Sequence, residues 1–176
     1  MNWDTFLLFD ALALAVAAAV VDVQHHRIPN WLTYPGMVLG ILLRWLFFGW
    51  KGLGSGLAGC LLAGGIVFLF YAVRAMGAGD VKLLAAIGSL VGPSHAIVVL
   101  LATAICGGVL AIVYAVYSRR IGATLRNVGL VLQFHSSSGI QAHPELNLDN
   151  PSALRMPYGL AIAAGTLYAF LGTWWR

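Results

Sequence analysis

Two aspartates, Asp22 and Asp80, stand beside apolar segments of the sequence, where a carboxylate calls for a functional explanation. Two carboxyl groups that share one proton can activate a water molecule for attack on a peptide carbonyl. One group takes a proton from the water, and the other, protonated, polarises the carbonyl oxygen. The pair therefore predicts hydrolysis of the aspartic type, provided that the fold brings the two side chains together.

The surroundings of each aspartate fit this chemistry. Asp80 closes the sequence Gly77-Ala78-Gly79-Asp80, in which Gly77 and Gly79 carry no side chain, so an extended substrate backbone could approach closely. Asp80 precedes a predicted helix and Asp22 ends one. Because the N-terminal end of a helix favours negative charge, we expect Asp80 to be the ionised base and Asp22 the protonated acid.

The composition predicts the kind of scaffold that positions this pair. The chain has 176 residues, of which 60% are hydrophobic and 9% are charged. Soluble domains carry about 25% charged residues. The high share of hydrophobic residues and the low share of charged ones exclude a soluble globular enzyme, a disordered chain and a disulfide-stapled secreted domain. They indicate a small integral membrane protein.

We expect an all-α integral membrane protein, a single transmembrane domain over residues 1–176 built as a bundle of about six helices. The uncharged run from Leu83 to Ser118 is too long for one span, and we expect it to divide at Gly92-Pro93. The predicted spans cover residues 5–21, 31–48, 53–73, 81–92, 95–117 and 156–175.

The basic residues predict the orientation, because cytoplasmic loops are enriched in Lys and Arg. One side of the six-span arrangement receives most of them, and that side is expected to be cytoplasmic, with both termini outside. It holds Arg27, Arg74, Lys82, Arg119, Arg120, Arg126 and Arg155, whereas the other side holds Arg44, Lys51 and Arg176. Asp22 and Asp80 then share the cytoplasmic boundary.

Two further segments follow from this arrangement. Asp10 lies about 18 Å from Asp22 along one helix, so we expect it to face the outer leaflet or to pair with Arg44 or Lys51. In the cytoplasmic loop 118–155, apolar residues recur at helical spacing. They predict a helix that lies in the membrane surface or packs as a short soluble helix on the other loops. These residues are Ile121, Leu125, Val128 and Leu132.

Three motifs resemble those of the type IV prepilin peptidases. The stretch from Asp22 to Asn30, DVQHHRIPN, is similar to the first aspartate motif of that family, and Gly77 to Leu83, GAGDVKL, to its GxGD motif. Met156-Pro157-Tyr158-Gly159 looks like the proline-containing start of the family's last span. The resemblance follows the whole chain in motif order.

The resemblance implies an aspartic endopeptidase of the bacterial inner membrane that removes a short cytoplasmic leader from prepilins. Long members carry a CxxC insertion associated with N-methylation. Here Cys60 and Cys106 form no CxxC, so the chain resembles the short Tad/Flp-pilus peptidases, which cleave without methylating. The expected partners are a prepilin and the lipid bilayer, with no nucleic acid and no cofactor.

The resemblance assigns Asp22 and Asp80 as the catalytic pair and Gly77 and Gly79 as residues that shape the site. Lys82 matches a motif position, where it either contacts substrate or extends to the lipid headgroups.

The other polar residues of the first motif and its proline are expected to have structural roles rather than catalytic ones. His25 and His26 are expected in a hydrated loop, and no metal site is expected, because no third ligand stands at a suitable spacing. Pro29 and Asn30 are expected to end one helix and start the next.

Other classes of protein remain as alternatives. A proton-coupled transporter also carries intramembrane acids and helices broken by Gly or Pro, although its acids are expected at the midplane. A serine protease of the membrane needs a GxSxG nucleophile, which Gly54-Ser55-Gly56 does not match. A purely structural subunit of an assembly is the third alternative.

Overall fold

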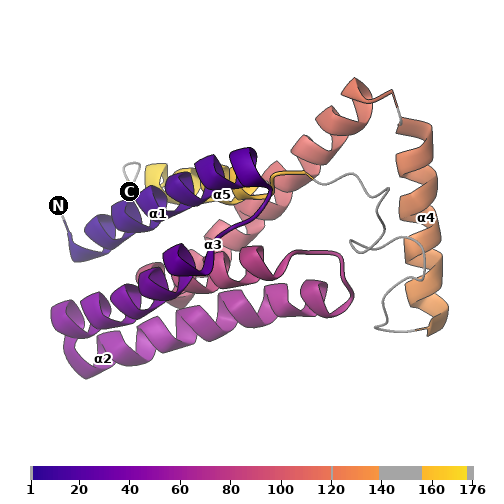
Figure 1. Cartoon of the computed structure of the whole chain (residues 1–176). Helices are drawn as coiled ribbons and strands as arrows, with labels where there is room; N and C mark the ends of the chain where they lie inside the picture. Colours follow the sequence, from indigo (N-terminus) through magenta and orange to yellow (C-terminus); the bar gives the residue numbers. More distant parts are fainter. Residues whose placement is uncertain (1, 120, 139–155, 174–176) are drawn as a thin grey trace.

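The computed structural model describes residues 2–119, 121–138 and 156–173, and every regular element among them is a helix (Figure 1). The all-α prediction is therefore confirmed for the described part of the chain. The elements are α1 (Trp3–His25), α2 (Asn30–Ala72), α3 (Ala78–Tyr117), α4 (Ile121–Ser138) and α5 (Gly159–Leu171).

The two longest helices are each interrupted by one glycine with a positive φ angle. Gly49 interrupts α2 at φ 61° and Gly92 interrupts α3 at φ 75°. Glycine adopts such angles at little cost because it has no Cβ. At the first break α2 folds back on itself as a hairpin, and at the second α3 changes direction (Figure 1). The break expected at Gly92-Pro93 is confirmed.

Three described helices, α1, α2 and α3, are long and apolar enough to cross a membrane. α5 is apolar but has 13 residues, and it begins at Gly159 rather than at 156, where the predicted span starts. The number of spans and the orientation of the termini stay predictions. The helix predicted within loop 118–155 is present as α4, whereas residues 139–155, with Arg155, and also Arg120 and Arg176 lie outside the described residues.

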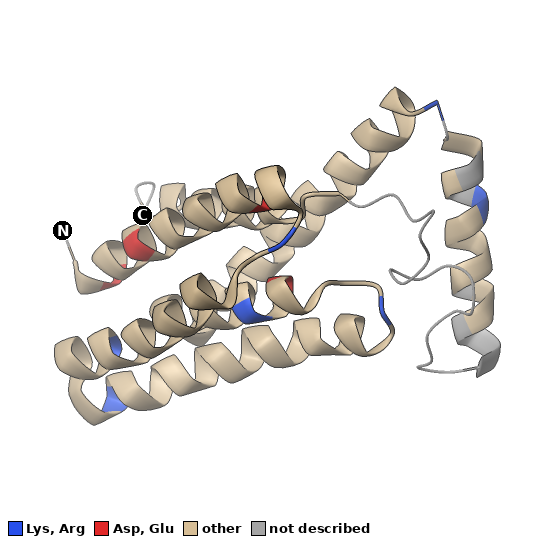
Figure 2. Cartoon of the chain, in the orientation of Figure 1, with Lys and Arg blue, Asp and Glu red and all other residues tan. Residues whose placement is uncertain are grey.

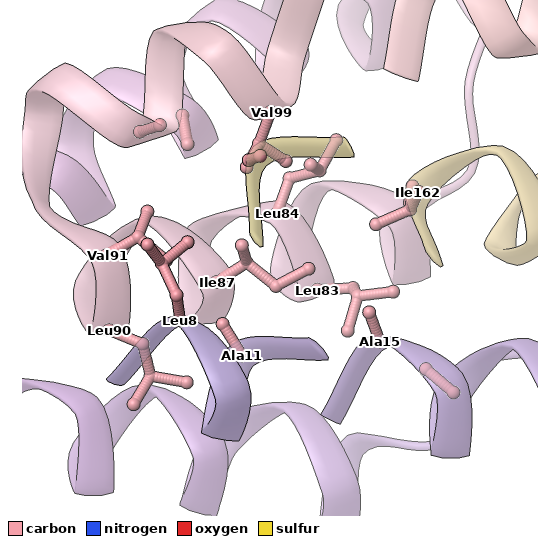
Figure 3. Packing of buried hydrophobic residues seen from close by; sticks show 14 of the residues in the cluster. Leu8, Ala11, Ala15, Leu83, Leu84, Ile87, Leu90, Val91, Val99 and Ile162 are labelled. Carbon is pink, nitrogen blue, oxygen red and sulfur yellow. The ribbon is translucent and has the colours of Figure 1, made fainter. Parts of the chain in front are cut away.

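The first half of α3 forms the centre of the fold. All of its residues from Leu83 to Gly92 are buried, as expected for a helix that is apolar on every side. α1, α2 and α5 all pack against α3. Figure 3 shows Leu83, Leu84 and Ile87 of α3 in the core together with Leu8 of α1 and Ile162 of α5.

Most of the ribbon of α1, α2, α3 and α5 carries no charged residue, and the charged residues lie mainly near the helix ends and in the links between them (Figure 2). Large hydrophobic residues are widely exposed, for example Leu61 at 73%, Ile105 at 69% and Leu46 at 65%. Soluble monomers rarely expose contiguous apolar surface of this kind. Contact with lipid explains this pattern, in agreement with the composition.

Arg44 stabilises the C-terminal end of the first half of α3. Its buried guanidinium group donates hydrogen bonds to the carbonyl oxygens of Leu90 and Val91, each at 3.3 Å, just before the break in α3. Carbonyl groups at a helix end lack intrahelical donors, so the guanidinium group supplies the hydrogen-bond donors that these carbonyl groups lose at the break. Arg44 also forms an ion pair with Asp4 at 3.0 Å. Of the positions expected for Asp10, the pairing with Arg44 is therefore wrong, because Asp4 reaches Arg44 from the first turn of α1.

We expect Arg44→Met to lower the free energy of unfolding by about 3 kcal/mol, because buried carbonyl groups lose their charged donor. Unfolding in detergent, followed by circular dichroism, measures the change. Lys51→Met is the matched control, since Lys51 is exposed and makes no interaction recorded in the described part of the chain. Equal stability of the two variants would contradict this role of Arg44.

Candidate active site

Asp22 lies in the last turn of α1, and its side chain is only 6% exposed. The helix ends because His26 adopts the left-handed conformation, with φ 51°, and its amide donates to the carbonyl oxygen of Asp22 at 2.7 Å. Pro29 then caps α2, which begins at Asn30. The start of α2 predicted at Pro29 and Asn30 is confirmed, whereas α1 already ends at His25, before Pro29.

The carboxyl group of Asp22 is held by the start of α5. The backbone amide of Gly159 donates a hydrogen bond of 2.8 Å to Oδ2 of Asp22. The first amides of a helix have no intrahelical acceptor and carry partial positive charge, so a carboxylate is a natural partner. This contact joins the first and the last described helices at the candidate site.

Asp80 lies in the first turn of α3, because the helix begins at Ala78, slightly earlier than the predicted span, which starts at residue 81. Its Oδ2 accepts a hydrogen bond from the backbone amide of Gly77, the N-cap residue, at 3.2 Å. Each aspartate thus uses one oxygen to accept a backbone amide. Within the described residues the Oδ1 atoms of both make no hydrogen bond to the protein, which leaves them for water or substrate. Since the hydrogen bonds are alike, the assignment of base and acid stays a prediction.

Asp22 and Asp80 line one cavity of about 800 Å³. The cavity is also lined by residues between or at the ends of the helices, and by residues within α2 and α3 that are all apolar except Thr103. The first group comprises His26, Ala75, Met76, Gly77, Met156 and Tyr158, and the second Ile66, Val67, Phe70, Leu84, Ile97, Leu100, Leu101, Thr103 and Ala104. The structure therefore brings together the two aspartates that the sequence singled out.

The glycines of the GxGD motif have contacts within the protein. A Cβ atom on Gly79 would lie 3.0 Å from Cβ of Ile28, so this glycine lets α3 begin against the link between α1 and α2. A Cβ atom on Gly77 would lie 3.1 Å from Oδ2 of Asp80. Gly77 also lines the cavity, and the role of both glycines in shaping the site stays a prediction.

Lys82 is engaged away from the aspartates. Its ammonium group donates to Oδ1 of Asn30 at 2.9 Å and lies 5.0 Å from the centre of the Tyr34 ring. Lys82 does not line the cavity with the aspartates. In this structure it therefore joins the starts of α2 and α3, and both roles considered from the sequence stay predictions.

The sequence does not indicate that two further residues line the cavity. His26 lies in the link between α1 and α2, and Tyr158 lies directly before α5, and both line the cavity. The signal for Tyr158 was its place directly before Gly159 in the third motif. Among the described residues, no group of three His, Cys, Asp or Glu side chains is placed to hold a metal ion.

The fold and the site define a class: helical proteins with spans of membrane length whose paired aspartates open on one cavity. Residues 9–112, which include both aspartates, match the model of the type IV leader peptidase family, and the chain belongs to this family.

A curated relative supports this assignment. The chain is 32% identical over 123 residues to the type 4 prepilin-like proteins leader peptide-processing enzyme of Escherichia coli O78:H11 (strain H10407 / ETEC). The match takes in 64% of this chain and 43% of the relative, so the chain spans less than half of the relative's length. No solved structure matches the chain significantly.

We expect Gly159→Ala to lower leader-peptide cleavage about 10-fold, because small displacements of reacting groups are costly. The added Cβ would lie 3.1 Å from both Cβ and Oδ2 of Asp22 and would shift that carboxyl group. Gly65→Ala is the control, since its Cβ would meet nothing within 4 Å. Cleavage rates of purified variants in detergent decide the point, and equal rates for both variants would contradict this role of Gly159.

Proposed function

We propose that this chain is a membrane-embedded aspartic endopeptidase that cleaves the cytoplasmic leader from Flp/type IV-like prepilins, at the cytoplasmic face of the bacterial inner membrane. The observation that carries the proposal is the shared cavity of Asp22 and Asp80. Membership of the type IV leader peptidase family and the similarity to a leader peptide-processing enzyme support it.

In the proposed reaction the pair begins with one proton. The ionised carboxylate, assigned to Asp80, takes a proton from water as the water oxygen bonds to the carbonyl carbon. Asp22 gives its proton to the carbonyl oxygen, which produces a neutral gem-diol. The C–N bond then breaks as the carboxyl group of Asp80 protonates the leaving nitrogen. Asp22 takes back a proton from a diol hydroxyl as the carbonyl re-forms, so the pair again holds one proton.

The walls of the cavity support a substrate with an apolar helix beside the cleaved bond. Ile66 and Phe70 of α2 and Ile97 and Leu101 of α3 line the cavity and are also exposed on the apolar surface of the bundle. A cavity with such walls is open toward lipid when the protein is in a membrane. A prepilin, whose hydrophobic helix follows its hydrophilic leader, could enter sideways and place the intervening peptide bond at the aspartates.

Cleavage without N-methylation is the finer part of the proposal. The two cysteines of the sequence, Cys60 and Cys106, lie in α2 and α3 and are far apart in the chain. The sequence thus has no CxxC pair of the type that accompanies methylation in the long peptidases that it resembles.

We expect Asp22→Asn and Asp80→Asn each to abolish leader removal, because asparagine keeps the size of aspartate but cannot exchange the proton. Wild type and variants are co-expressed with a Flp-type prepilin, and mass spectrometry of the pilin measures both the loss of the leader and the absence of a methyl group on the new N-terminus. Asp10→Asn is the control and should cleave normally, since Asp10 does not line the cavity.

Two results would overturn the proposal. Full processing by either cavity variant would show that the aspartates do not catalyse cleavage. Loss of proton-coupled transport in those variants, measured in proteoliposomes with processing unchanged, would favour the transporter.

We expect Leu101→Trp to raise KM for prepilin about 10-fold, because the larger ring fills the apolar part of the cavity. Ile105→Trp is the matched control on the same helix. Leu101 is 62% exposed and Ile105 69% exposed, but only Leu101 lines the cavity. The KM values of the detergent-solubilised enzymes measure the effect, and a tenfold cost corresponds to about 1.4 kcal/mol of binding free energy. An unchanged KM for Leu101→Trp would place the pilin helix elsewhere.

A further inference from the structure

Two of the residues that line the cavity, Thr103 and Tyr158, carry hydroxyl groups that the reaction described above does not use. Oγ1 of Thr103 is buried and has no hydrogen-bond partner among the described residues. A Cβ atom on Gly165 would collide with it, so α5 closes over this hydroxyl and keeps it from substrate. Tyr158 is half-buried, and its hydroxyl makes no recorded hydrogen bond in the described part of the chain.

Tyr158 is held on two sides in the cavity that the aspartates line. Its neighbour Gly159 is fixed by the hydrogen bond to Asp22. Its ring lies against Gly107 of α3, where an added Cβ would be 2.8 Å from Cε2 and 2.9 Å from the hydroxyl oxygen. The phenol is therefore a positioned group that shares a cavity with Asp22 and Asp80, rather than a freely rotating surface side chain.

The hydroxyl of Tyr158 is suited to donating a hydrogen bond. Tyrosine titrates near pH 10, so the group keeps its proton at neutral pH. A donor that is already in place where negative charge develops stabilises a transition state without reorganisation. The backbone amides of Gly77 and Gly159 cannot serve in this way, because the carboxyl groups accept their hydrogen bonds.

We propose that Tyr158 is a further catalytic residue, whose hydroxyl donates a hydrogen bond to the oxygen of the scissile carbonyl group while water adds to the carbon. The inference rests on the proposed peptidase function. Tyr158 transfers no proton, so the proton balance between Asp22 and Asp80 is unchanged.

The test is the steady-state cleavage of a prepilin by Tyr158→Phe. Phenylalanine keeps the ring against Gly107 and removes only the donor. We expect kcat to fall about 100-fold, the usual effect of losing one such donor, while KM stays within about twofold. Tyr168→Phe on α5 is the control, because Tyr168 is 64% exposed and does not line the cavity.

A second pair of variants tests the position of the ring with the hydroxyl retained. Gly107→Ala forces the ring of Tyr158 to move, and we expect kcat to fall about 10-fold or more. Gly108→Ala is its neighbour on the same helix, and its Cβ would meet nothing within 4 Å, so it should keep the wild-type kcat.

The outcomes separate the two levels of inference. Wild-type kcat in Tyr158→Phe, or a change confined to KM, overturns the role of Tyr158 and leaves the proposed peptidase intact. Processing that survives in Asp22→Asn or Asp80→Asn overturns the peptidase and the role of Tyr158 together. If Tyr158→Phe unfolds at a much lower temperature than wild type, the comparison of Gly107→Ala with Gly108→Ala decides instead. Equal kcat values for these two variants would overturn the inference.

Discussion

The hydrogen bond from the amide of Gly159 to the carboxyl group of Asp22 connects the first and the last described helices at the proposed catalytic site. A carboxyl group that is almost fully buried needs donors, because removing it from water without compensation is expensive. The first turn of a helix supplies amides that have no other partner. The same solution holds Asp80, which accepts the amide of Gly77 at the start of α3. The site is thus built from helix ends, where unpaired backbone groups and carboxyl groups stabilise one another.

At the C-terminal end of the first half of α3, a positive side chain binds backbone carbonyl groups, instead of a negative side chain binding backbone amides. There a buried cation, Arg44, donates to the carbonyl oxygens that precede the break at Gly92. The first half of α3 therefore has an acid, Asp80, at its N-terminal end and the guanidinium group of Arg44 at its C-terminal end. Each charge is opposite to the partial charge of the helix end beside it. Because the residues from Leu83 to Gly92 are all buried, the position of this half-helix is fixed, and Asp80 is fixed with it.

Much of the fold was predictable because membrane segments have strong sequence signals. The helical class, the break at Gly92, the turn at Pro29 and the helix α4 all follow from apolar runs, glycines, prolines and periodicity. The candidate pair was predictable because a carboxylate beside an apolar helix is rare enough to attract attention. The partner of Arg44 was predicted wrongly, because both Asp4 and Asp10 lie on α1 and spacing along one helix does not say which of them faces α2.

By itself, the sequence determined that this is a helical protein of apolar segments with acids at two particular helix ends, since composition and local spacing are properties of the chain alone. Tertiary structure decided that Asp22 and Asp80 share a cavity, that Gly159 holds one of them, and that Tyr158 lines the same cavity. It also decided that Lys82 donates a hydrogen bond to Asn30. These contacts join residues that are far apart in the sequence. They depend on how whole helices pack, which the pattern of residues along any one helix does not specify.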